Sequence, residues 1–139
     1  MPHEQAELDW KSILESAGPY PLEAFHFVRE GLSYTVERVH DEHDGNDHEL
    51  AGNSRHISGQ ELCLGLRDYA IERYGLLAPV VLRQWRITRT DDFGRMVFAM
   101  IDAGLMSKTP DDSIDDFRAV YDFDEAFHRE TLVEHLGVN

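Results

Sequence analysis

The clearest pattern of hydrophobic and polar positions lies in the central stretch Ser58 to Phe123, where it predicts three helices followed by two strands. Ser58 and Glu61 have the spacing of a capping box, which marks the start of a helix. Apolar residues then recur on one helical face, at Leu62, Leu66, Tyr69 and Ala70. Gly75 predicts the end of this helix. The interior Gly65 indicates close approach by a neighbouring helix, because glycine otherwise destabilises a helix interior.

Two further helices are predicted in the same stretch. Pro79 suits the first turn of a short helix that ends near Trp85. Thr90 can cap the next helix, and Asp91-Asp92 follow in its first turn, where the helix dipole favours negative charge. Ala103-Gly104-Leu105 is typical of a Schellman end, in which a glycine is followed by an apolar residue.

The hydrophobic period changes after this third helix. Residues 105–108 predict one strand, and alternating apolar residues predict a second strand over residues 117–123. The connection between them, residues 109–116, is acidic and rich in turn formers. Three helices followed by such a pair of strands are typical of a winged-helix core with a short β-hairpin wing. A short irregular segment would fit the same residues.

Before this core, the pattern predicts a helical hairpin. Its helices cover residues 4–17 and 20–40, and the broad apolar face of the second must pack on the first and on the core. Residues 41–55 have no hydrophobic period and many turn formers, which predicts a loop.

After the core, a last helix is predicted over residues 124–136, capped by Asp122 or Asp124. The fold class is therefore mainly α, with a winged-helix-like core, in one domain over residues 1–139. Its parts are the hairpin 1–40, the loop 41–55, the core 56–123 and the C-terminal helix 124–139.

The amino-acid composition limits the classes of protein to which the chain can belong. The chain has 139 residues, of which 42% are hydrophobic, enough for one compact domain with a core. It contains no apolar run of the roughly 20 residues that a transmembrane helix needs, and its start lacks the apolar segment of a signal peptide. The single cysteine, Cys63, cannot form an internal disulfide. We therefore expect a cytoplasmic protein without membrane contact.

Charge is spread unevenly along the chain. The net charge is −14, yet residues 51–108 carry 8 basic and 6 acidic side chains. Residues 1–50 carry 12 acidic and 3 basic side chains, and residues 109–139 carry 9 and 2. Such acidic flanks would repel nucleic acid, which is bound through Lys and Arg at phosphates. Four arginines around the second core helix could contact phosphates or a partner, although pairing with the acidic flanks is favoured: Arg83, Arg86, Arg89 and Arg95.

Histidine and carboxylate residues gather between residues 40 and 56, which raises the alternative of a metal-dependent enzyme. Imidazole and carboxylate groups suit zinc or nickel, and the candidate ligands are His40, His43 and His56. No H-E-x-x-H motif or cysteine pair accompanies them, and a polar loop has the same composition. Cys63 lies beside Leu62, which favours a core cysteine over a reactive one. We predict no catalytic residue and no cofactor.

Four motifs run through the chain from about residue 20 to residue 128. They are Tyr20-Pro21-x-x-Ala24-Phe25-x-Phe27-Val28-x-x-Gly31-Leu32-x-Tyr34-Thr35, Arg55-His56-x-Ser58-Gly59-Gln60-Glu61-Leu62, Thr90-x-Asp92-Phe93-Gly94-x-x-Val97-Phe98 and Asp116-Phe117-x-x-Val120-Tyr121-Asp122-Phe123. Together they resemble a small, uncharacterised bacterial family restricted to Planctomycetes and Verrucomicrobia. The resemblance implies no catalytic residues. It implies that the second motif matters as a unit, which makes Arg55, His56 and Gln60 candidate binding residues.

These observations predict a non-catalytic protein-interaction or regulatory module that binds another protein or a second copy of itself. Two alternatives remain open. One is a nucleic-acid-binding regulator that uses the four arginines, and the other is the metal-dependent enzyme.

Overall fold

The computed structural model describes residues 2–42 and 56–137, with side chains over residues 10–40 and 56–137. The helices of the described residues are α1 (Pro2–Ala17), α2 (Leu22–Glu42), α4 (Gly59–Tyr74), α5 (Ala78–Gln84), α6 (Thr90–Asp102), α7 (Phe123–Ala126) and α8 (Arg129–Leu136). Two short 3₁₀ helices complete them, η2 (Gly75–Leu77) and η3 (Ile114–Phe117). The predicted mainly α fold is confirmed. Residues 43–55 of the predicted loop lie outside the described residues.

Helices α2 and α4 pack extensively on each other, and glycines lie at their contact. A β-carbon at Gly65 of α4 would lie 1.8 Å from Thr35 Oγ1, and one at Gly31 of α2 would lie 2.2 Å from Leu66 Cδ2. Each helix therefore has a glycine where the other inserts a side chain. The close approach predicted at Gly65 is confirmed, and so is the capping box of Ser58 with Glu61 at the start of α4.

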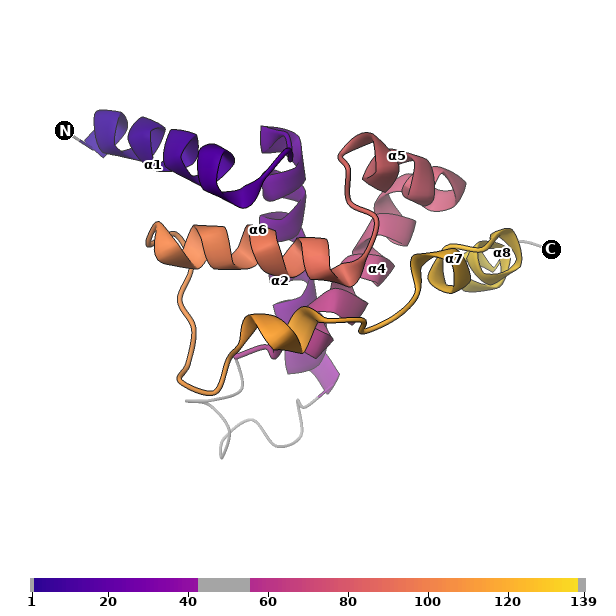
Figure 1. The fold of residues 1–139 in the computed structure, drawn as a ribbon. Coiled ribbons are helices and arrows are strands. Elements are labelled where there is room, and N and C mark those ends of the chain that lie inside the picture. The colour runs from indigo at the N-terminus through magenta and orange to yellow at the C-terminus, as the bar shows by residue number, and fades with distance from the viewer. Residues whose placement is uncertain (1, 43–55, 138–139) are drawn as a thin grey trace.

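Helix α6 lies across this pair and also contacts α1, as Figure 1 shows. Its predicted Schellman end is present, because the Leu105 amide donates to the Met100 carbonyl at 2.9 Å and the Gly104 amide to the Ile101 carbonyl at 3.0 Å. Gly104 has a φ of 82°, in the left-handed region that such an end requires.

The prediction that Thr90 caps α6 is wrong. Thr90 is the first residue of the helix and is fully buried. Its hydroxyl donates to the Phe117 carbonyl at 2.6 Å and accepts from the Val120 amide at 3.0 Å. Asp92 takes over the role of the cap, since its Oδ2 accepts from the amides of Thr88 at 2.8 Å and Arg89 at 3.1 Å.

The predicted β-hairpin wing is not formed, so the winged-helix part of the fold prediction lacks support. Residues 105–123 are described throughout and contain no strand. Ser113 and Asp116 instead cap η3, where the Ser113 amide donates to Asp116 at 3.0 Å. Ala119 has a φ of 47°, which interrupts any extended run. The alternation of apolar residues has another cause, because Phe117 points into the core while Tyr121 and Phe123 stack at 5.6 Å.

The predicted C-terminal helix consists of two helices, α7 and α8. Asp122 caps α7, as predicted, by accepting from the amides of Asp124 at 2.8 Å and Glu125 at 3.3 Å. The buried Phe127 then leaves the helical path. A new helix starts after His128, whose Nδ1 accepts from the Glu130 amide at 3.3 Å. Figure 1 shows α7 and α8 next to each other at the C-terminal end.

One hydrophobic core connects the helices. Its largest fully buried side chains come from α1, α2, α4, α5, α6 and the connection after α5: Ile13, Phe25, Phe27, Leu66, Ile71, Leu82, Ile87, Phe93, Met96 and Met100. The Tyr20 hydroxyl, between α1 and α2, donates a short buried hydrogen bond to Asp92 of α6. Within the described part of the chain, no helix is both long and apolar enough to span a bilayer.

Candidate functional site

A cavity of about 340 Å³ opens where α2, α4, α6 and the segment from Leu105 to Phe117 meet. Its surface is about equally apolar and polar, and the apolar part of the lining comprises Leu32, Val36, Ile57, Gly59, Leu62, Val97, Phe98, Ile101, Leu105, Met106 and Phe117. Polar side chains complete it, namely His56, Ser58, Ser107, Lys108, Asp112 and Asp116. We call this space the His56 cavity.

Two glycines, each part of one of the four sequence motifs, allow Phe117 of the His56 cavity to pack closely on α4 and α6. A β-carbon at Gly59 of α4 would lie 2.9 Å from Phe117 Cε1, and one at Gly94 of α6 would lie 2.8 Å from Phe117 Cβ. Phe117 therefore wedges between the two helices at points where neither has a side chain. Its ring also meets Phe98 edge to face at 6.2 Å. The segment after α6 is held in place by this wedge and by Thr90.

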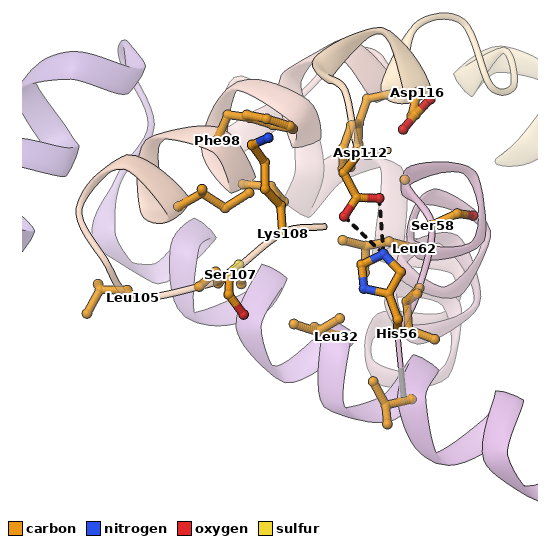
Figure 2. A pocket seen from close by; sticks show the side chains of 17 residues that line it. Leu32, His56, Ser58, Leu62, Phe98, Leu105, Ser107, Lys108, Asp112 and Asp116 are labelled. Carbon is orange, nitrogen blue, oxygen red and sulfur yellow. Dashed lines mark hydrogen bonds and ion pairs between the residues drawn. The ribbon is translucent and has the colours of Figure 1, made fainter. Parts of the chain in front are cut away.

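A polar contact at the cavity joins His56 to Asp112, residues that lie 56 positions apart in the sequence. The His56 Nε2 lies 3.0 Å from Asp112 Oδ1 and 2.9 Å from Oδ2. Figure 2 shows both carboxylate oxygens turned toward the imidazole ring. Asp112 Oδ2 also accepts from the Thr109 amide at 2.9 Å. The pair thus joins the chain just before α4 to the segment after α6.

The electrostatics of Asp112 follow from these contacts. Burial alone would raise the pKa of its carboxyl, since the charged form loses water. The hydrogen bonds from the Thr109 amide and His56, with the attraction of His56, outweigh burial and lower the pKa below its ordinary value. Asp112 is therefore charged at neutral pH and is the acceptor that holds His56 at the cavity.

The predicted unit Arg55, His56 and Gln60 is only partly brought together. His56 lines the cavity, whereas Gln60 is exposed on α4 and does not line it. Arg55 lies outside the described residues. Ser58, from the same motif, lines the cavity, and its hydroxyl accepts from the Glu61 amide at 3.1 Å.

The four predicted arginines lie elsewhere, around α5 and the first half of α6. All four side chains are exposed, and none lies within 4.0 Å of a carboxylate among the described side chains. The favoured pairing with the acidic flanks is therefore absent from this part of the chain. Arg83 and Arg89 line two adjoining hollows that share Thr88, Phe123 and Asp124. The binding residues predicted from the sequence therefore belong to two separate surfaces, the His56 cavity and the surface around α5.

Arg95 differs from the other three arginines because it acts on Tyr20. Burial, followed by the hydrogen bond to Asp92, raises the pKa of the Tyr20 hydroxyl to about 12, and the Arg95 guanidinium offsets part of this rise. Arg95 thus belongs to the neighbourhood of the Tyr20–Asp92 contact.

The predicted metal ligands do not form a site in the described residues. His40 is exposed near the end of α2, and His56 pairs with Asp112. His43 lies outside the described residues. Over the described side chains, no three His, Cys, Asp or Glu residues gather as a metal site would require.

Cys63 is a core residue, as its apolar neighbour suggested. Its side chain is fully buried, and burial, with a contribution from Asp91, raises the pKa of the thiol to about 12. A reactive cysteine needs the opposite shift, because the thiolate is the nucleophile.

Sequence reasoning missed the second half of the cavity. Asp112 and Lys108 come from the segment that was predicted as the wing and its loop. No local pattern could indicate the His56–Asp112 pair, because it depends on how that segment folds back over α4. The close packing at Gly59 and Gly94 was a usable signal, since glycine inside a helix indicates a close neighbour.

Comparison of the chain with protein-family models, with curated proteins and with solved structures found no match.

Proposed function

We propose that the protein is a non-catalytic interaction or regulatory module that receives an apolar anchor side chain of a partner protein in the His56 cavity. The observation that carries this proposal is a half-open cavity in which apolar side chains of three helices meet polar side chains of the segments before α4 and after α6. Tight protein interfaces commonly place one aromatic or aliphatic side chain in such a pocket, with polar groups around it.

The size of the cavity supports an anchor rather than a large ligand. Ligand pockets generally measure about 300–1,000 Å³, and the His56 cavity, at about 340 Å³, is at the low end of that range. A phenylalanine, tyrosine or leucine side chain would contact Leu62, Val97 and Ile101, and the polar groups of the partner backbone could then meet the rim.

The chemistry of the rim favours binding over catalysis. The His56 ring makes no hydrogen bond to Ser58 or Ser107, the two hydroxyls of the cavity lining, among the contacts of the described side chains. A serine nucleophile requires such a bond to a base. The pair of His56 and Asp112 therefore serves to position the rim in this proposal.

A site-specific photocrosslinker tests the proposal in cells of the source. Benzoylphenylalanine at Met106, on the cavity lining, is compared with the same group at Glu134, which is exposed on α8. We expect a discrete crosslinked species from position 106 only, and its loss when Leu105→Trp fills the cavity. Melting curves verify that the filled variant is folded. Equal crosslinking at both positions, or no discrete species at position 106, would refute the proposal.

A nucleic-acid-binding regulator is the second candidate, and one observation favours it. Arg83, Arg86 and Arg89 are exposed and lie within 4.0 Å of no carboxylate among the described side chains. Fluorescence anisotropy with a labelled DNA duplex and a single-stranded RNA at low salt tests it. Binding that weakens with salt and disappears in Arg83→Ala/Arg89→Ala supports this candidate. The absence of binding at low salt removes it.

We also propose that the chain belongs with the bacterial family that its motifs resemble. The packing of Gly59 and Gly94 against the same residue, Phe117, supports treating three of the four motifs as one structural unit. Sequences of that family should then carry a small residue at both glycine positions and a large one at position 117. An alignment in which these positions vary independently would contradict this assignment.

A further inference from the structure

The 3₁₀ helix η2 and the short helix α5 together expose an apolar ridge, with Leu76 and Leu77 on η2 and Val80 on α5. Leu76, Leu77 and Val80 are 46%, 63% and 51% exposed, and they include the most exposed large hydrophobic residues of the described chain. The opposite side of α5 is fully buried through Ala78 and Leu82. A helix that is apolar on both sides normally has neighbours on both sides. We call Leu76, Leu77, Val80, Arg83 and Arg86 the α5 surface.

Basic side chains continue this ridge, and none of them lies within 4.0 Å of a carboxylate among the described side chains. Arg83 follows Val80 by one helical turn, and Arg86 follows the end of the helix. One carboxylate, Asp124, lines the same hollow as Arg83 but does not lie within 4.0 Å of it. Asp91 and Asp122 line the adjoining hollow with Arg89, and backbone amides donate to both of them. Asp91 accepts from the Ala119 amide at 3.2 Å, and Asp122 accepts from the Asp124 amide at 2.8 Å. The arginines are therefore available to an acidic partner while these acidic groups are already hydrogen-bonded.

Arg86 occupies a position at which glycine would be unstrained. Its φ is 64°, and the Ile87 amide donates to the Leu82 carbonyl at 2.9 Å, as in a Schellman end. This position usually holds glycine, because a β-carbon in the left-handed region costs about 1–2 kcal/mol. Strained positions of this kind cluster at binding sites. The strain at Arg86 places an exposed guanidinium next to the ridge.

A hollow beside Arg83 offers a socket for one side chain. It measures about 480 Å³ and is lined by Pro79, Arg83, Ile87, Thr88, Phe123, Asp124, Phe127 and His128. Ile87 and Phe127 are buried beneath it. The hollow thus has an apolar floor and an edge that carries both Arg83 and the carboxylate of Asp124, and it continues the ridge of α5 toward α7 and α8.

We propose that the α5 surface docks an acidic amphipathic helix of a partner protein. Leu76 to Arg83 spans about two helical turns at about 1.5 Å per residue, so a helix laid along α5 could match it turn for turn. Its apolar stripe would cover Leu77 and Val80, and its Glu or Asp residues would face Arg83 and Arg86. A second copy that used the same surface is a poorer occupant, because it would bring Arg83 and Arg86 of both copies together without acidic partners.

This surface is separate from the His56 cavity. The cavity lies at the second half of α6, around Val97 and Ile101, whereas α5 precedes the first residue of α6. None of the residues of the α5 surface lines the cavity, so variants of one surface leave the lining of the other unchanged.

Fluorescence anisotropy of the full chain with a designed probe tests the proposal. The probe is a fluorescein-labelled helical peptide with a leucine stripe flanked by glutamates. A matched peptide carries lysine in place of each glutamate. We expect the Glu peptide to bind and the Lys peptide not to bind. Binding of the Glu peptide should weaken about tenfold or more in Arg83→Glu/Arg86→Glu and in Leu77→Ser/Val80→Ser, as expected for lost charge and apolar contacts.

Arg129→Glu, a charge reversal at an exposed position of α8, is the matched control and should bind like wild type. Circular dichroism establishes that each variant is folded. The proposal is overturned if the Glu peptide does not bind at its highest soluble concentration, or if Arg129→Glu weakens it as much as the α5 variants do. It is also overturned if sedimentation shows a dimer that Leu77→Ser dissociates, because the occupant is then a second copy.

Discussion

Thr35 of α2 fills the space that a side chain at Gly65 of α4 would occupy. Its Oγ1 would lie 1.8 Å, and its Cβ 2.7 Å, from a β-carbon at position 65. The Thr35 hydroxyl also donates to the Gly31 carbonyl at 2.6 Å, which fixes its orientation. This contact sets the separation of the two helices that form one side of the His56 cavity.

Gly65→Ala should therefore destabilise the protein, although alanine is the better helix former. The new methyl group forces α2 and α4 apart, and overpacking of this kind costs about 1–3 kcal/mol. Urea unfolding followed by circular dichroism measures the change. Ser33→Ala, at an exposed position of α2, is the control and should change stability by less than about 0.5 kcal/mol. Equal stability of the two variants would show that the helices are not in close contact.

Arg86→Gly should stabilise the protein by about 0.5–1 kcal/mol, because glycine relieves the strain of the left-handed conformation but gains entropy on unfolding. Arg83→Gly, three residues earlier within α5, should lower stability by about 1 kcal/mol, since glycine is unfavourable inside a helix. Thermal unfolding of both variants provides the measurement. If both substitutions shift stability in the same direction, residue 86 is not at a left-handed helix end.

The contribution of Asp112 to stability should depend on pH. Its pKa in the folded protein is below the ordinary value of 3.8. Its stabilisation is therefore complete above the unfolded pKa and is lost as pH falls through the folded pKa. We expect Asp112→Asn to reduce the free energy of unfolding by about 1 kcal/mol at neutral pH. The difference from wild type should shrink below about pH 4. Urea unfolding at a series of pH values measures it, and a difference that grows toward acid pH would reverse the sign argued here.

The Cys63 thiol should be unreactive in the native protein. It is fully buried, and its pKa is about 12, so very little thiolate exists at pH 8. A colorimetric disulfide reagent should therefore react at the rate of opening of the structure, and immediately in concentrated urea. The reaction in urea is the internal control. Rapid modification of native protein would show that α4 exposes this residue.

Sequence reasoning predicted the helices well where local chemistry determines them. Ser58 with Glu61, the glycine at position 104 and Asp122 each cap a helix end through contacts within a few residues. Those signals lie in residues that are neighbours in the sequence, and they do not depend on the rest of the fold. Thr90 is the exception, because a contact with Phe117 uses the hydroxyl that would otherwise have capped α6.

The segment after α6 could not be predicted in the same way. Its apolar residues alternate as in a strand. Phe117 nevertheless packs into the core, because Gly59 and Gly94 have no side chains and leave space for it. That space exists only once α4 and α6 have packed. The candidate site has the same limitation, since His56 was identified from its motif whereas its partner Asp112 depends on this long-range folding.

The buried contact between Tyr20 and Asp92 links the connection of α1 and α2 to the start of α6, which limits how the protein can be truncated. Asp92 fixes the start of α6 by accepting hydrogen bonds from the Thr88 and Arg89 amides, and it also accepts one from the Tyr20 hydroxyl. The first two helices therefore cannot be trimmed away or replaced by those of a homologue as a detachable piece. A chimera would have to transplant both residues together, because without the Tyr20 hydroxyl the buried Asp92 Oδ1 would lose its hydrogen-bond donor.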